Sequence, residues 1–170
     1  MRNPRISRSQ FLQIAVFLSF VLFAIPSSGL AKDPPSDLCA LLPPAQLGKV
    51  LGQAYKAPEK STAPPPYAAN PAGTQCVYSA EKSGGKSVIF IVYVDPSTAV
   101  AKETFSKLSM FYAPATPAAG IGDTAYLDAK HAIHVLAGKV RYFISIPIAT
   151  YTPENEKLLK DLATSVAGQL

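Results

Sequence analysis

The sequence predicts an α+β fold in which an antiparallel sheet of about five strands carries two to three helices packed on one face. Five short stretches are rich in β-branched and aromatic residues, which is typical of strands. Three other stretches repeat apolar residues at the spacing of an amphipathic helix. Strand stretches follow one another directly across glycine-containing turns, and this order favours antiparallel hairpins over parallel strands joined by helices.

The first 31 residues are predicted to be a secretory signal peptide rather than part of the fold. They begin with three arginines and no acidic residue, and continue with an apolar run of 15 residues at positions 11–25. They end in the small residues Gly29 and Ala31, as a cleavable signal does, and we expect cleavage after Ala31. A spanning helix needs about 20 apolar residues, so an uncleaved membrane anchor is the less favoured alternative.

Removal of residues 1–31 changes the charge of the protein. The whole chain carries a formal charge of +5, but the signal holds three of its 16 basic residues and none of its 11 acidic residues. The remaining +2 gives no support for nucleic-acid binding, which needs a concentrated basic face. Residues 32–170 are long enough for a single α+β domain. We expect this domain to be a periplasmic or secreted monomer without a stable membrane span.

Cys39 and Cys76 are the only cysteines of the chain, and both follow the signal. An isolated, even pair in an oxidising compartment predicts a disulfide. The 36 residues between them form a long loop, for which chain entropy predicts a stabilisation of about 4 kcal/mol. A redox or metal-binding pair is the alternative, but the cysteines have no Cys-x-x-Cys spacing and no histidine nearby in sequence. Lipidation of Cys39 is excluded because seven residues separate it from the cleavage site.

Residues 53–73 form a proline-rich segment that contains five prolines. Proline removes backbone donors and disfavours both helices and central strands, so we expect an extended, mobile loop. The disulfide would keep the two flanks of this loop docked. Its Pro-Pro-Pro-Tyr stretch at 64–67 formally fits a ligand of proline-recognition domains. Those domains belong to intracellular signalling, so a plain surface loop is the favoured interpretation.

The first helical region is predicted within residues 36–52. Ser36 or Asp37 can cap a short helical start, because both side chains accept hydrogen bonds from free backbone N–H groups. The prolines at 43–44 interrupt this start. A second helical piece follows them, and Gly52 suits its end.

Two strands are expected after the proline-rich segment, at residues 74–80 and 87–94, joined by a turn at Gly84 and Gly85. The second strand is apolar on both of its faces, which predicts a central strand covered on both sides. The Gly-Gly-Lys-Ser of this turn lacks the earlier glycine of a phosphate-binding loop and leads into a strand. Nucleotide binding is therefore excluded.

Two longer helices are predicted from apolar stripes at helical spacing. In residues 95–112, Asp95 is expected to cap the helix and Pro96 to occupy its first position. In residues 152–170, Thr152 is expected to cap the C-terminal helix.

Three further strand stretches lie between those helices, within residues 123–148. Gly120 and Gly122 mark a bend before the first of them, where Asp123 is expected to make local backbone hydrogen bonds. A dinucleotide-binding fingerprint would follow a strand and open a helix, whereas this Gly-x-Gly leaves a loop and begins a strand. Residues 137–139 are expected to form the tight turn of the last hairpin.

His131 and His134 are the only histidines of the chain. On a strand, residues three positions apart point to opposite sides of the sheet, so no metal site is predicted. We expect His134 to share a face with Leu136, as a partly buried or ligand-facing residue. We expect His131 to lie near a turn at residues 128–130.

Short motifs at four places suggest a relationship to a known family. They are Cys-x-Leu-Leu, Leu-Gly-Lys-Val-Leu-Gly, Cys-Val-Tyr-Ser and Gly-Ile-Gly-Asp-Thr-Ala-Tyr-Leu, followed by a strand pair and a helix. In this order they resemble a family of exported bacterial lipoproteins of unknown function, over about residues 37–170. The resemblance implies an α+β sandwich with a disulfide between Cys39 and Cys76, and it carries over no catalytic residues. The chain departs from the family in lacking a lipidation cysteine, so membrane tethering does not follow.

The favoured function is a non-enzymatic binding or accessory module of the bacterial cell envelope. The sequence contains no recognisable catalytic set, cofactor motif or metal-ligand spacing. The partner would be an envelope protein or an apolar small ligand. Tyr55, Tyr67 and Tyr78 are candidate contact residues, because aromatic side chains carry much interface energy, and His134 is a fourth candidate. The alternative for each tyrosine is a packing or loop role.

The alternative function is a small periplasmic hydrolase. The residues available for acid–base chemistry are Asp123, Asp128, His131 and His134. Ser79 or Ser145 would be the nucleophile, although neither lies in a recognisable nucleophile elbow.

Overall fold

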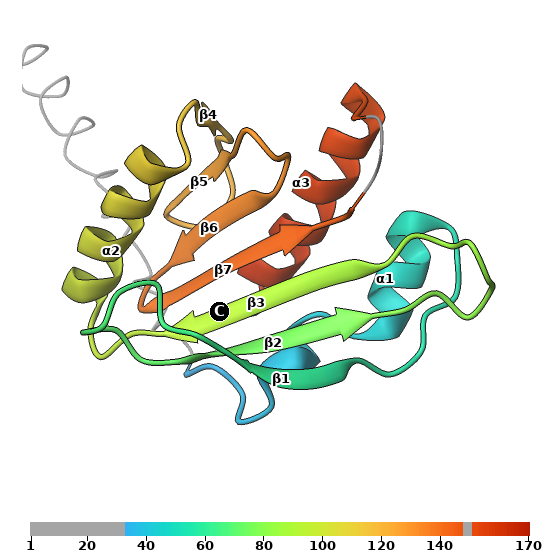
Figure 1. The fold of residues 1–170 in the computed structure, drawn as a ribbon, viewed down its shortest axis with the longest axis horizontal. Coiled ribbons are helices and arrows are strands. Elements are labelled where there is room, and N and C mark those ends of the chain that lie inside the picture. Colours follow the sequence, from blue (N-terminus) through green and yellow to red (C-terminus); the bar gives the residue numbers. More distant parts are fainter. Residues whose placement is uncertain (1–32, 148–150) are drawn as a thin grey trace, which may run out of the picture. The chain divides into compact units, whose positions relative to one another are not determined.

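The computed structural model describes residues 33–147 and 151–170, and the predicted signal peptide with its cleavage site lies outside them. The described residues, part of one unit that spans Ala31–Leu170, form one antiparallel sheet of seven strands in the order β1-β2-β3-β7-β6-β5-β4 (Figure 1). The strands are β1 (Glu59–Ala63), β2 (Gly73–Tyr78), β3 (Val88–Val94), β4 (Thr116–Pro117), β5 (Thr124–Leu127), β6 (Ile133–Ala137) and β7 (Val140–Ser145). The predicted α+β class with an antiparallel sheet is confirmed.

The described sheet has seven strands, whereas the sequence predicts about five. The five predicted strands are its central members, and the two missed strands, β1 and β4, are its edges. Four of the five residues of β1 are exposed, and β4 has only two residues, one of them a proline. Edge strands of this kind lack the apolar alternation that identifies central strands, and they tolerate proline.

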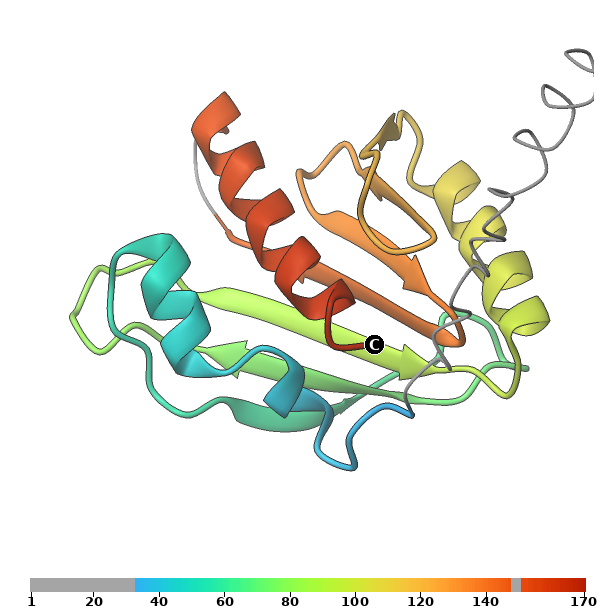
Figure 2. The same ribbon diagram turned by 180° about the vertical axis from the view of Figure 1, so that it is seen from behind.

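The helices lie on both faces of the sheet, which corrects the prediction of helices on one face. They are a 3-10 helix η1 (Leu38–Leu41), α1 (Pro44–Leu51), α2 (Thr98–Phe111) and α3 (Pro153–Ala167). On the first face lie η1, α1 and α3 (Figure 2), whereas α2 packs on the second face. Alternate residues explain the difference, because Val135 packs toward α3 and its neighbour Leu136 packs toward α2. Among the described residues, no helix is long and apolar enough to cross a membrane.

The main core lies between the first face and the helices η1, α1 and α3. Its largest fully buried side chains come from both layers and include Leu41, Leu42, Leu47, Tyr78, Phe90, Ile133, Ile144, Leu159 and Leu162. Each such side chain contributes about 1.5–3 kcal/mol on burial. The Tyr142 hydroxyl donates to the carbonyl oxygen of Ala163 at 2.6 Å and so joins β7 to α3.

Most of the predicted helix ends are confirmed, but the predicted start of α2 is wrong, and Pro96 lies before the cap rather than at the first helical position. Asp37, Gly52 and Thr152 occupy the expected positions at the ends of η1, α1 and α3. Asp95 does not cap α2, because the side chain of Ser97 accepts the hydrogen bond from the first turn. Asp95 is instead buried beneath the second face.

The predicted bend before β5 is confirmed, since Gly120 and Gly122 have φ angles of 81° and 57°. A side chain at Gly122 would also collide with the backbone of Leu136. The expected local hydrogen bonds of Asp123 are wrong. Its carboxylate accepts a hydrogen bond at 2.9 Å from the backbone of Gly138, in the tight turn between β6 and β7.

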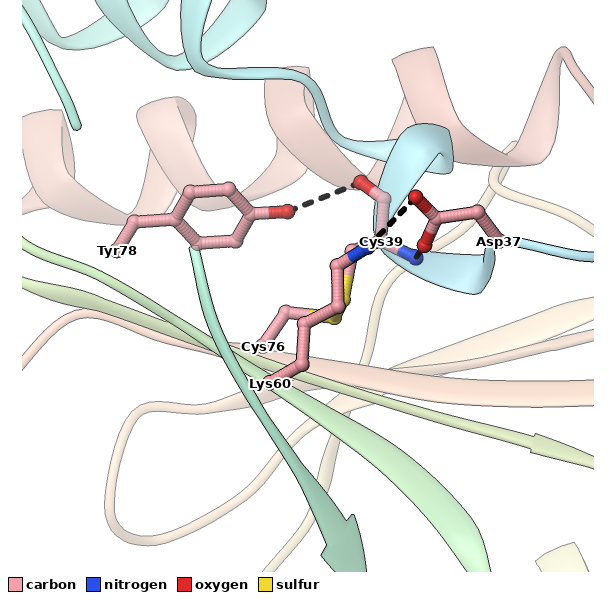
Figure 3. Close-up of a disulfide and its surroundings, with 5 residues drawn as sticks. All are labelled: Asp37, Cys39, Lys60, Cys76 and Tyr78. Atoms are coloured by element: carbon pink, nitrogen blue, oxygen red, sulfur yellow. Dashed lines mark hydrogen bonds and ion pairs between the residues drawn. A yellow bond between two sulfur atoms is a disulfide. The ribbon is translucent and has the colours of Figure 1, made fainter. Parts of the chain in front are cut away.

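The predicted disulfide between Cys39 and Cys76 is confirmed, with a Cα–Cα distance of 5.9 Å (Figure 3). It joins η1 to β2, and both half-cystines are buried. Asp37 accepts hydrogen bonds from the backbone N–H of Cys39 and from the ammonium of Lys60. The Tyr78 hydroxyl donates to the carbonyl oxygen of Cys39 at 3.0 Å. The disulfide therefore lies within a network that fixes η1 to the sheet.

The proline-rich segment 53–73 is not the structureless loop that the sequence predicts. Its middle forms β1, which pairs with β2, and Tyr55 forms a bridge to Ala80. The part that follows β1 lies against the second face, where the Tyr93 hydroxyl donates to the carbonyl oxygen of Pro64 at 3.0 Å. None of the five prolines lies within β1, since Pro58 precedes it and Pro64 follows it, so none removes a backbone donor from the pairing with β2.

Candidate functional site

Three rings form a stack across the second face of the sheet. Tyr126 on β5, His134 on β6 and Phe143 on β7 occupy matching register positions on neighbouring strands. The ring centroids of Tyr126 and His134 lie 4.7 Å apart, and those of His134 and Phe143 lie 5.4 Å apart. Neighbouring strands are about 4.8 Å apart, so rings at matched positions meet face to face.

Helix α2 lies over this ring stack. Phe105 contacts Tyr126 at a centroid distance of 5.1 Å, and Tyr112, which follows the helix, contacts His134 at 4.9 Å. The side-chain amide of Asn70, in the proline-rich segment, donates to the Thr104 hydroxyl at 3.0 Å. The helix is thus held by aromatic contacts from the sheet and by a polar contact from the segment after β1.

Asp128 and His134, the middle ring of the stack, form a buried pair with 2.9 Å between the Asp128 carboxylate and His134 Nε2. The other carboxylate oxygen of Asp128 accepts hydrogen bonds from the backbone N–H groups of Lys130 and Ala132. Burial alone would raise the pKa of Asp128. The hydrogen bonds from His134 and from the two backbone groups outweigh it, so this pKa lies below its ordinary value.

A second buried pair joins Arg141 to Asp95. The Arg141 guanidinium donates hydrogen bonds to both carboxylate oxygens of Asp95. The guanidinium also lies over the ring of Tyr93, 4.9 Å from its centroid. A pocket of about 50 Å³ lies beside this pair and the ring stack. It has room for about one water molecule. The Arg141 guanidinium already covers the face of the Tyr93 ring, so a ligand cation has no free aromatic face there.

A larger groove, of about 820 Å³, runs between α2 and the strands β4 and β5. The residues that α2 contributes recur at helical spacing and so share one side of the helix; they are Lys102, Phe105, Ser106, Ser109 and Met110. The opposite wall contains Ala115, Pro117, Asp123, Thr124, Ala125, Tyr126 and Leu136. Most of these groups are apolar, and the groove is open to solvent along its length.

Tyr126 lines this groove, but its hydroxyl is closed off from solvent and has no hydrogen-bond partner among the described residues. Tyr126 as a whole is only 5% exposed. Burial raises the pKa of Tyr126, so the hydroxyl stays protonated and able to donate. A buried hydroxyl without a partner costs about 1–3 kcal/mol.

The structure separates the four candidate contact residues of the sequence. Tyr55 and Tyr78 are buried in the main core, so the expectation that they form a binding surface is corrected. Tyr67 is 39% exposed, in the segment that follows β1. His134 is buried in the ring stack, on the same face as Leu136 as predicted.

The residues of the alternative hydrolase are only partly brought together. Asp128 pairs with His134, whereas Asp123 binds the turn at Gly138 and His131 stacks on Tyr151 at a centroid distance of 3.7 Å. The residues that line the small pocket beside His134 include no serine, threonine or cysteine. In the part of the chain that the structure describes, no group of three His, Cys, Asp or Glu residues could hold a metal ion.

The groove and its Tyr126 hydroxyl are not predicted from the sequence. Tyr126, His134 and Phe143 lie on three separate strands, and only the register of those strands shows that they are neighbours. The apolar residues on both faces of β3 are the one signal that points to a covered second face.

No known protein family, no characterised protein and no solved structure matches this chain. Its function is therefore argued from the site itself.

Proposed function

We propose that the protein is an exported, non-enzymatic binding module of the bacterial cell envelope, and that it binds a small apolar ligand in the groove between α2 and β5. The observation that carries this proposal is a largely apolar groove lined by Tyr126, whose buried hydroxyl has no partner among the described residues. A bound ligand would supply the missing acceptor once the side chain turns toward it. Ligand sites are typically concave and mostly apolar, with a few polar groups that orient the ligand.

Two further features support this proposal. The Cys39–Cys76 disulfide is compatible with a protein that works outside the cytoplasm, where disulfides persist. The groove lies on the second face, and Ala125 is the one lining residue that belongs to the main core closed by η1, α1 and α3. Ligand binding would therefore leave the main core unchanged.

The test compares Tyr126→Phe with Tyr151→Phe in the mature protein purified from its own envelope fraction. Tyr151 is the matched control, because its hydroxyl is also buried without a partner, and it does not line the groove. Native mass spectrometry of the wild type is expected to show an added small-molecule mass. Tyr126→Phe should weaken binding about fivefold, the effect of losing one hydrogen bond, and so lower the occupancy, whereas Tyr151→Phe should not.

Without ligand, Tyr126→Phe should be at least as stable as the wild type, since it removes an unsatisfied polar group. Equal ligand occupancy in the two variants would contradict the proposed role of Tyr126. A wild type that carries no small molecule, and takes up none from an envelope lipid extract, would contradict the proposed function as a whole.

A further inference from the structure

The groove has charged groups at one end only. Lys102 and Asp123 are the charged residues in its lining, one on each wall. Both lie toward the turn between β6 and β7. The backbone N–H of Asp95, just before α2, donates to the carbonyl oxygen of Lys139 in this turn, which places the N-terminal end of α2 and Lys102 near it. Asp123 accepts a hydrogen bond from Gly138 in the same turn. Neither charge is in an ion pair within the described residues.

The opposite end of the groove is apolar. The chain leaves the C-terminal end of α2 and enters β4, where Pro117 pairs with Tyr126. The lining at this end consists of Met110, Ala113, Ala115 and Pro117. Met110 is 68% exposed and its neighbour Phe111 78% exposed, so the apolar surface continues beyond the groove.

The Tyr126 hydroxyl lies between these two ends. Tyr126 is three residues along the chain from Asp123, which corresponds to about 10 Å in an extended strand. From the turn toward the end of α2, the groove is therefore lined by a pair of opposite charges, then by Tyr126 with its buried, unpartnered hydroxyl, and then by an apolar surface.

We propose that this groove binds a single-chain amphiphile with a zwitterionic head group, of the lysophospholipid class. The inference rests on the proposed function and names its ligand. Lys102 binds the head-group phosphate and Asp123 binds the head-group ammonium, which matches the two signs of charge present. On binding, Tyr126 turns its buried hydroxyl toward the ligand and donates to an ester oxygen of the linker. The acyl chain lies against the apolar residues that lead to Met110.

A peptide strand paired to the sheet edge fits this site less well. The edge strand β4 has two residues, and one of them is Pro117, which has no N–H to donate. Strand addition depends on a row of free backbone groups, which this short edge does not supply.

The test uses the mature, oxidised protein and three probes of equal chain length below their micelle concentrations. The probes are lysophosphatidylethanolamine, a fatty acid and a monoacylglycerol, and binding is measured by isothermal titration calorimetry. The variants are Lys102→Gln and Asp123→Asn. Lys107→Gln is the matched control, because Lys107 lies on the same helix, pairs with Glu103 and does not line the groove.

The proposal predicts that lysophosphatidylethanolamine binds most tightly of the three. Lys102→Gln should weaken it about tenfold and also weaken the fatty acid, whereas Asp123→Asn should weaken lysophosphatidylethanolamine but not the fatty acid. Monoacylglycerol binding should not change in either variant, and Lys107→Gln should change none of the three. Thermal melts of each variant show that the fold is retained.

Equal binding of the three probes, unaffected by the two variants, would overturn the proposed head-group recognition and leave an apolar site intact. No binding of any probe by a protein that still carries an endogenous ligand sensitive to Tyr126→Phe would also overturn the ligand class, but not the proposed function. No binding of any probe and no endogenous ligand would overturn both.

Discussion

Asp95 and Arg141 show how the role of a single residue depends on its partner across the sheet. Asp95 precedes a helix and has the residue type of a cap, yet it is buried and bonded to Arg141 on β7. Arg141 is 46 residues away in sequence, so no local pattern links the two. Ser97, two residues later, makes the actual cap.

We predict that Asp95→Ala lowers the free energy of unfolding by about 3–5 kcal/mol, because it leaves Arg141 charged, buried and unpaired. Ser97→Ala removes only the cap of α2 and should cost about 1 kcal/mol. Urea unfolding of the two variants measures the difference. Equal, small losses would show that the ion pair is not the main role of Asp95.

Asp128 should make the stability of the protein fall in acid. Its pKa in the folded protein is lowered, despite burial, by hydrogen bonds from His134 and from two backbone groups. Its contribution is therefore fully present above the unfolded pKa of about 3.9, and is lost as the pH falls through the folded pKa. Asp128→Asn should lower the free energy of unfolding at neutral pH and flatten its decline below about pH 4.

The measurement is urea unfolding of the wild type and Asp128→Asn at a series of pH values between about 2 and 7. The two curves should converge toward the acid end. Parallel curves over the whole range would mean that Asp128 titrates alike in the folded and unfolded states.

His134 is the residue of the candidate site that the sequence anticipates most closely. Strand periodicity predicts that it shares a face with Leu136 and that His131 points elsewhere, and both are found. Tyr126 is the residue that the sequence misses. Its importance depends on an absent hydrogen bond partner in the described residues and on a helix from another part of the chain, and periodicity reports neither.

At the scale of elements, the sequence predicts the five central strands and misses the two edges. Central strands such as β3 can be recognised in the sequence by apolar residues on both faces. The same apolar residues indicate that both faces of the sheet are covered. The observed position of α2 on the second face fits this pattern better than the predicted arrangement with all helices on one face. β1 and β4 are fixed by pairing with β2 and β5 rather than by their own composition.

The disulfide joins two of these elements, η1 and β2, and should contribute measurably to stability. Replacing both Cys39 and Cys76 by alanine is expected to lower the free energy of unfolding by about 2–4 kcal/mol, because the unfolded chain is no longer constrained. Urea unfolding with and without a reductant checks this. The reductant should destabilise the wild type and leave the double variant unchanged, and an equal response of the two proteins would contradict the prediction.

At the scale of the whole molecule, the two faces of the sheet have different roles. The first face, with η1, α1 and α3, forms the main core and contains the disulfide. The second face carries α2, the ring stack and the groove. Substitutions of exposed groove residues such as Lys102 and Asp123 should therefore alter ligand binding without loss of the fold, whereas large-to-small substitutions in the main core should destabilise the whole domain.

The central claim is that the groove between α2 and β5 is a ligand site. Its most direct test is a comparison of amide chemical shifts, by NMR, between the mature protein as purified from its envelope fraction and the same protein after removal of bound lipids. If the groove is a ligand site, the shift changes will be concentrated in residues 102–113 and 123–126, with little change in β1 and β2. Identical spectra, or changes confined to β1 and β2, would contradict it.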